Sequence, residues 1–247
     1  MTVAPTAQAR TLLTDIDSHS RSTEPVPWTS TRMHRRQFSA SLLGASAASL
    51  GWIGKAGAQG GPVEGTHYVR LSQPVPAGPA GKIEVIEFFW YGCPHCNAFE
   101  PALEAWVKQL PADVAFHRVP VAFSNEPFVA HQRIFYALDS LGLLAAMHHK
   151  VFYAIHNDRA RLDKPAEISA FMVRNGIDGA KFMEAFDSFG VQAKVRQATQ
   201  QAAAYKIDGV PALGIQGRYY TSGSLAGTND KALAVADFLI QRLRKGA

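Results

Sequence analysis

The chain has 247 residues, of which 47% are hydrophobic and 18% charged, so it can bury a full core and is not disordered throughout. Its net charge of +5 is unevenly placed: the first 58 residues hold six basic and three acidic side chains, which leaves 19 basic and 17 acidic ones, or +2, for the remainder. A body this weakly basic, without basic patches interleaved with aromatic residues, argues against a nucleic-acid-binding protein.

Residues 1–58 have the composition of a leader. Residues 1–32 are polar and show no hydrophobic period, and we interpret them as an upstream over-read. Residues 33–58 have a basic start at Arg35-Arg36, an apolar stretch of roughly fifteen residues and a small-x-small site ending at Ala58. A membrane-spanning helix needs about 20 apolar residues. We therefore predict a signal peptide that is cleaved near Ala58, rather than a retained anchor, and export to the periplasm.

The first half of the remaining chain predicts a short strand, followed by a strand, a helix and a further strand. A short strand is expected at His67–Leu71, and the β-branched and aromatic run Lys82–Tyr91 predicts a central strand covered on both faces. Apolar residues at helical spacing predict a helix over Cys93–Leu110. Asp113–Phe123 is a further strand, parallel to the central one if the helix is its crossover.

The second half predicts a helical block followed by a hairpin and a helix. Five helices are expected, over Phe128–Leu141, Leu143–His156, Pro165–Asn175, Ala180–Phe186 and Val191–Tyr205. A hairpin turning at Gln216-Gly217 follows within Pro211–Thr221, and the last helix covers Asp230–Leu243. This order predicts an α/β protein with a thioredoxin-like fold. Its two parts, residues 62–125 and 199–247, would flank an inserted all-helical domain at 126–198.

Cys93 and Cys96 are the only cysteines, and they form a Cys-Pro-His-Cys motif. A c-type haem site needs His after the second cysteine, where Asn97 stands. A zinc site needs two further thiolate or imidazole ligands, and no histidine pair with metal-binding spacing lies near the motif, so we predict neither metal nor cofactor. A structural disulfide remains the simple alternative, although a bridge across two residues constrains little of the unfolded chain.

A redox-active pair is the favoured interpretation because the motif follows a strand and opens a helix. Free N–H groups at the helix start would stabilise a Cys93 thiolate, and Cys96, one turn further, would resolve a mixed disulfide. Pro94 suits the first helical turn. His95 can add a hydrogen bond or a positive charge, and a stabilised thiolate makes the disulfide a strong oxidant.

The stretch EFFWYGCPHCNAFE, Glu87–Glu100, resembles the active-site segment of the DsbA family of thiol oxidases, and GVPA, Gly209–Ala212, resembles its cis-proline loop. The resemblance covers nearly all of the chain after the leader. It implies that Cys93 attacks, that Cys96 resolves, and that Val210-Pro211 is a cis bond that helps to bind substrate. That family is itself the standard example of a low-pKa, oxidising pair, so this expectation comes from the resemblance.

Several other side chains carry expectations. Glu87, an acid within an apolar strand, matches the family's buried acid and would exchange a proton with Cys96, since burial raises its pKa. Glu100 matches a second family acid, with an exposed helical position as the equal alternative, and Arg118 is a candidate partner for Glu87. Surface positions are expected for His148, His149 and His156, and core positions for Phe171, Phe182, Phe186 and Phe189.

The predicted function is an exported oxidase that introduces disulfides into reduced, newly translocated proteins. A DsbB-type membrane partner carrying quinone would reoxidise it, and we expect a monomer. The alternatives are a disulfide isomerase or reductase on the same fold, or a redox-inert binding module with a structural disulfide. A measured reduction potential separates these three.

Overall fold

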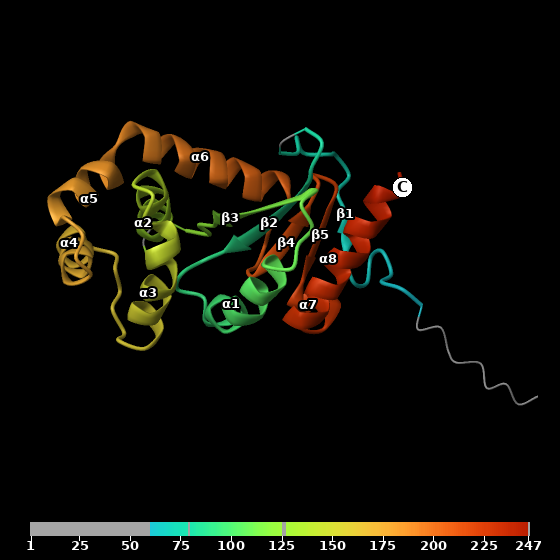
Figure 1. Ribbon diagram of the computed structural model, residues 1–247, viewed down its shortest axis with the longest axis horizontal. Coiled ribbons are helices and arrows are strands. Elements are labelled where there is room, and N and C mark those ends of the chain that lie inside the picture. Colours follow the sequence, from blue (N-terminus) through green and yellow to red (C-terminus); the bar gives the residue numbers. More distant parts are fainter. Residues whose placement is uncertain (1–59, 79, 125–126, 247) are drawn as a thin grey trace, which may run out of the picture. The chain divides into compact units, whose positions relative to one another are not determined.

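One mixed sheet organises the part of the chain that the structure describes. The computed structural model describes residues 60–78, 80–124 and 127–246, so the predicted leader lies outside the described residues. The sheet has the strand order β1-β5-β4-β2-β3 (Figure 1). The strands are β1 (Val69–Arg70), β2 (Ile83–Phe89), β3 (Val114–Pro120), β4 (Ala212–Ile215) and β5 (Tyr219–Ser222).

The centre of the sheet is a strand–helix–strand unit. Helix α1 (Pro94–Val107) connects β2 to β3, and the two strands pair in parallel, as predicted. On its other side β2 pairs antiparallel with β4, and β4 turns into β5 through Gln216 and Gly217, which both have positive φ. Parallel strands followed by an antiparallel hairpin make the sheet thioredoxin-like, which confirms the predicted fold class.

Both faces of β2 are buried because different helices cover them. Ile86 and Phe88 pack on the face that α6 (Phe189–Ala204) covers, whereas Val85 packs with Ile240 of α8 (Asn229–Arg244). Helices α1 and α8 contact each other, and α8 contacts β4 and β5 (Figure 1). Two-sided burial explains why β2 is apolar except for two buried acids, Glu84 and Glu87. Glu87 lies on the α1 face of the sheet, where it shares Arg118 with Glu100 of α1.

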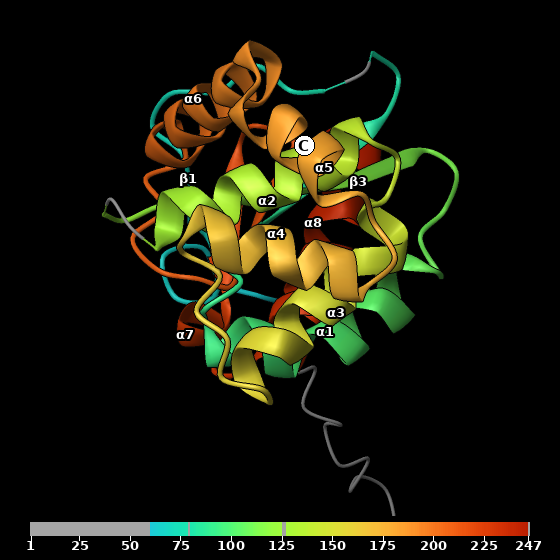
Figure 2. The same cartoon turned by 90° about the vertical axis from the view of Figure 1, so that its left-hand side faces the viewer.

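Five helices form the insertion between β3 and β4. With α6 these are α2 (Phe128–Ser140), α3 (Leu144–His156), α4 (Pro165–Arg174) and α5 (Gly179–Asp187), each within two residues of its predicted bounds. Helix α2 contacts α3, α5 and α6 and so lies at the centre of the insertion (Figure 2). The predicted domain boundary at residue 198 falls inside α6, whose last turns pack against the sheet.

The insertion has its own apolar core, with one exception to the prediction. Phe171, Phe182 and Phe186 are buried, as expected. The prediction for Phe189 is wrong, because 78% of its surface is exposed. It is the first residue of α6, directly after the N-cap Ser188, and its ring lies against the guanidinium of Arg196.

Two further differences concern short elements. Helix α7 (Gly223–Ala226) was not predicted, because a single turn is too short to show a hydrophobic period. The strand expected at His67–Leu71 is reduced to β1, which pairs with the short β5. Within the described residues, no helix is long and apolar enough to cross a membrane.

Candidate active site

The two cysteines lie where β2 ends and α1 begins. Cys93 is the N-cap residue of α1, and its Sγ accepts a hydrogen bond from the N–H of Cys96 at 3.4 Å. Pro94 follows at the start of the helix, where a missing N–H costs no hydrogen bond. Both cysteines are free thiols; Cys93 exposes 7% of its surface and Cys96 none. The start of α1 therefore leaves Cys93 slightly accessible and buries Cys96 completely.

The two thiols differ strongly in acidity. A hydrogen bond from the Cys96 thiol, together with the backbone N–H groups of Cys96 and His95 and the charge of His95, lowers the pKa of Cys93 to about 6 against a partial burial penalty. Complete burial, and the same hydrogen bond, raise the pKa of Cys96 far above its ordinary value. The sequence named the helix start and His95, which both contribute, but it missed the Cys96 thiol, which contributes most.

The loop before β4 reaches the outer cysteine. The Val210-Pro211 peptide bond is cis, and the carbonyl oxygen of Val210 accepts a hydrogen bond from Cys93 Sγ at 3.4 Å. A groove of about 480 Å³ begins here; its lining includes His95, Val210, Pro211 and residues of α7. The structure thus brings together two segments that lie more than a hundred residues apart in the sequence.

Two buried carboxyl groups lie behind the cysteines, joined by one arginine. Arg118 on β3 stands beside Glu87 in the strand register; its Nε donates to Glu87 Oε2 and its Nη2 to Glu100 Oε2, both at 2.9 Å. Glu87 is fully buried, as expected, and Glu100 is 2% exposed, so the alternative of an exposed helical position for Glu100 is wrong. Burial, with the repulsion of Glu100, raises the pKa of Glu87 to about 8 despite Arg118.

Two histidines expected on the surface are part of this site instead. His148 of α3 is 4% exposed; its Nδ1 lies 2.8 Å from the Tyr91 hydroxyl and its Nε2 3.3 Å from Glu100 Oε1. His156 Nε2 lies 2.8 Å from the carbonyl oxygen of Tyr91. The surface prediction was wrong for His148, whereas His156 is partly buried. For His148 a signal existed, because it shares one helical face with Met147, Val151 and Phe152, all buried.

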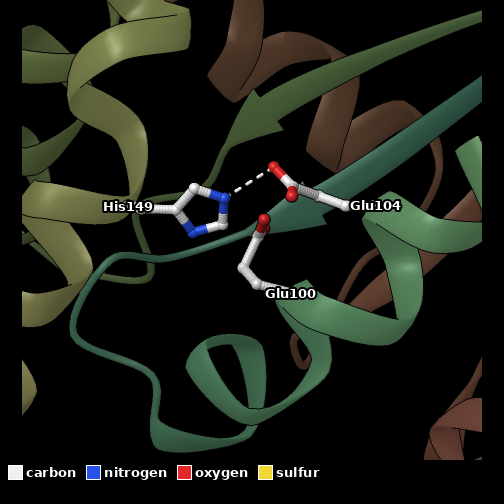
Figure 3. Close-up of side chains that lie close together, drawn as sticks. All are labelled: Glu100, Glu104 and His149. Atoms are coloured by element: carbon white, nitrogen blue, oxygen red, sulfur yellow. Dashed lines mark hydrogen bonds and ion pairs between the residues drawn. The ribbon is translucent and has the colours of Figure 1, made fainter. Parts of the chain in front are cut away.

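A third histidine pairs with α1 closer to solvent. Figure 3 shows His149 hydrogen-bonded to Glu104, at 2.6 Å, with Glu100 beside them. One nitrogen or oxygen atom from each of these three residues lies within 4.8 Å of the others, the spacing of a possible metal site. However, Glu100 is already bound by Arg118 and His148. We therefore interpret the group as a polar contact between α1 and α3 and assign no metal to it.

Three aromatic rings pack together beside the end of β2 that leads into the motif. The Trp90 ring stacks on Phe128 with centroids 4.1 Å apart, and Phe123 lies edge-on to Phe128. Phe123 is 45% exposed. Nothing in the sequence indicated that these three rings lie together, because they come from two loops and a helix.

A thioredoxin-like sheet with an acidic thiol at a helix start, a buried second thiol and a cis-proline loop against the first defines a thiol–disulfide oxidoreductase. Comparison with known proteins agrees: the sequence profile of the DSBA-like thioredoxin domain matches residues 84–232. The chain belongs to the DsbA family.

The relatives match over most of their length. The thiol:disulfide interchange protein DsbA of Pseudomonas aeruginosa is 39% identical over 206 residues, which is 83% of this chain and 97% of that protein. The DsbA of Bordetella pertussis is 43% identical over 212 residues, covering 85% and 97%. The crystal structure of P. aeruginosa DsbA superposes with a TM-score of 0.72 at 40% identity, covering 75% of this chain and 96% of that one. The DsbA structure from Xylella fastidiosa gives 0.69 at 32% identity, covering 74% and 98%.

Proposed function

We propose that this chain oxidises thiols of exported client proteins through a disulfide between Cys93 and Cys96. The observation that carries the proposal is the difference between the two thiols, with a pKa of about 6 for Cys93 and a strongly raised pKa for the buried Cys96. At neutral pH the better leaving group is therefore the outer sulfur. A pair that stabilises its reduced form in this way gives its disulfide readily to a client.

The first exchange opens the disulfide of the oxidised chain. A client thiolate attacks Cys93 Sγ, the bond between the two cysteine sulfurs breaks, and Cys96 leaves as a thiolate. In its buried position that thiolate needs a proton, because burial disfavours the charged form. The carboxyl group of Glu87, with a pKa of about 8, is protonated at neutral pH and supplies it.

The second exchange releases the client. The second client thiolate attacks the client sulfur of the mixed disulfide, and Cys93 leaves as a thiolate stabilised by the Cys96 thiol and by the N–H groups of the helix start. Two electrons have then moved from the client to Cys93 and Cys96, and the client has gained a disulfide. Pro94 and His95 shape the surface next to the attacked sulfur, since both are exposed.

The groove beside Cys93 is our candidate for client binding. Val210 places a backbone carbonyl at the edge of the groove, and Pro211 has no N–H to compete for the sulfurs. An extended client segment could pair with the backbone of Val210 as an added strand. The exposed ring of Phe123, which lies against Phe128, offers a further apolar surface.

We further propose that the chain works as a monomer in the periplasm after removal of residues 1–58, and that a DsbB-type membrane protein carrying quinone reoxidises it. Membership of the DsbA family and the signal-peptide pattern of residues 33–58 support this. Mass spectrometry of the exported protein should place the N-terminus near Gln59. Residues 1–32 on exported material would contradict the proposed processing.

The reduction potential tests the central proposal. Equilibration of the purified chain with reduced and oxidised glutathione should give a potential above about −180 mV, the value for protein disulfide isomerase. A potential below that value would contradict an oxidase and favour an isomerase or reductase. Reduction that makes the chain less stable would instead indicate a structural disulfide.

A further inference from the structure

The cluster behind the cysteines holds one cation and two carboxyl groups. Arg118 hydrogen-bonds to Glu87 and to Glu100, both at 2.9 Å, and both carboxyl groups are buried. One arginine balances one carboxylate, and an unpaired buried charge is costly. The cluster is neutral when a single proton is held on one of the two carboxyl groups, so the question is which of them holds it.

The hydrogen bonds of the two carboxyl groups are unequal. Glu100 is bound through both oxygens, by Arg118 at Oε2 and by His148 Nε2 at Oε1. Glu87 is bound only through Oε2, and its buried Oε1 has no hydrogen-bond partner among the described residues. A carboxyl group with more donors around it is more stable as the anion. This asymmetry favours an ionised Glu100 and a protonated Glu87.

Tyr91 decides which way the His148 ring donates. Its hydroxyl lies 2.8 Å from His148 Nδ1, and burial raises the pKa of Tyr91 well above its ordinary value, so the phenol keeps its proton and donates it. Burial also lowers the pKa of His148, which keeps the ring neutral. A neutral ring that accepts at Nδ1 carries its proton on Nε2, the nitrogen that faces Glu100.

We propose that His148 is a positioning residue of the inserted helical domain: by donating to Glu100 it leaves the shared proton of the cluster on Glu87, next to Cys96. The coupling to catalysis rests on the proposed function, but the place of the proton does not. The groups that face the cluster come from four segments: Cys93, Cys96, Glu100 and Glu104 from α1, Glu87 and Tyr91 from β2 and its end, Arg118 from β3, and His148 and His149 from α3.

Removing the His148 donor should move the proton. Without this donor, the ionised form of Glu100 is less stable and Glu100 takes the proton. Arg118 then pairs with the carboxylate of Glu87 alone. An opposite charge without a competing carboxylate lowers a carboxyl pKa by about 1–3 units. Glu87 would then be largely ionised at pH 7, and it could no longer protonate the leaving Cys96.

Carbon-13 NMR titration of the glutamate carboxyl groups in the reduced full chain measures this without any turnover, with Glu87→Gln assigning the signal. The parent midpoint for Glu87 should lie near pH 8, as the structure implies. In His148→Leu it should fall by about 1–3 pH units. His148→Gln keeps an N–H donor, so its Glu87 midpoint should return most of the way to the parent value. His149→Gln is the comparison variant on the same helix: His149 hydrogen-bonds to Glu104 and acts on Glu100 only through its charge, so the Glu87 midpoint should fall less in this variant than in His148→Leu.

Tyr91→Phe keeps the proposal testable if His148→Leu does not fold. It removes only the hydroxyl that orients the ring, and it should lower the Glu87 midpoint in the same direction but by less. An unchanged midpoint in every folded variant that lacks the His148 donor or the Tyr91 hydroxyl overturns the role of His148.

The rate of the first exchange separates this inference from the proposed function. A fall of the Glu87 midpoint from about 8 to about 6 reduces its protonated fraction at pH 7 about tenfold, so single-turnover oxidation of a dithiol peptide should slow by up to that factor. A lowered midpoint with an unchanged rate would support the placement of the proton by His148 and overturn the proton-donor role of Glu87.

Discussion

The hydrogen bond from the Cys96 thiol is the strongest influence on the acidity of Cys93, and replacing Cys96 tests it. Cys96→Ala deletes the donor but leaves the helix start and His95 in place. A hydrogen bond to a charged group contributes about 1.5–3 kcal/mol, or about 1–2 pKa units. We therefore expect the pKa of Cys93 to rise from about 6 to about 7–8 in this variant.

Alkylation rates at two pH values measure the change, since the thiolate is the reacting form. For a pKa near 6, the rate rises only about twofold between pH 6 and pH 8, whereas for a pKa near 7.5 it rises about 25-fold. Cys93 is the only thiol left in Cys96→Ala, so the signal is unambiguous. Cys96→Ser keeps a hydroxyl donor at the same place and should stay near the parent ratio.

A twofold ratio retained in Cys96→Ala would refute the reasoning, because the helix start and His95 would then account for the whole shift. The same comparison ranks His95. Its charge is the smallest of the named contributions, so His95→Ala should change the ratio less than Cys96→Ala does. A larger effect of His95→Ala would make His95, rather than the Cys96 thiol, the main cause of the low pKa of Cys93.

Three further outcomes are expected. Because the folded pKa of Cys93 is depressed, the reduced form gains stability that is complete above the unfolded thiol pKa and is lost as pH falls through about 6. In urea denaturation the reduced form should therefore lose about 1 kcal/mol more unfolding free energy than the oxidised form between pH 7 and pH 5, after allowance for solvent screening. The pKa of Glu87 is raised, so this carboxyl group destabilises the folded state increasingly as pH rises from about 4.5 to about 8. Glu87→Gln should therefore stabilise the chain by about 1–3 kcal/mol at pH 7 and by less at pH 5. A destabilised variant at pH 7 would contradict the raised pKa. Phe182→Ala should lower the free energy of unfolding by about 3–5 kcal/mol because the ring is fully buried, whereas Phe189→Ala should change it by no more than about 0.5 kcal/mol. Equal losses in the two variants would show that Phe189 is a core residue.

Much of the fold and the centre of the site were predictable from the sequence, because their signals are local. The β-branched and aromatic run at Ile83–Phe89 gave the central strand, and helical spacing gave the insertion within two residues at each helix end. The Cys-Pro-His-Cys motif at a strand-to-helix junction gave the redox pair and its outer member, since N-cap geometry follows from neighbouring residues. The burial of Glu87 also followed from its apolar neighbours in the strand.

Only the tertiary structure decided how distant groups meet. Arg118 faces Glu87 and Glu100 because β3 pairs with β2 in one register, and a shift of one residue would turn it to the other face. The apolar face of α3 indicated that His148 is buried, but its contact with Glu100 exists because α3 packs on α1, and no local pattern encodes that contact between the insertion and the sheet domain. Phe189 is exposed because α6 begins at the edge of the insertion, where an apolar residue finds no neighbouring helix to cover it. The sequence determined which cysteine begins the helix, and the packing of separate elements decided which charged and hydrogen-bonding groups surround the pair.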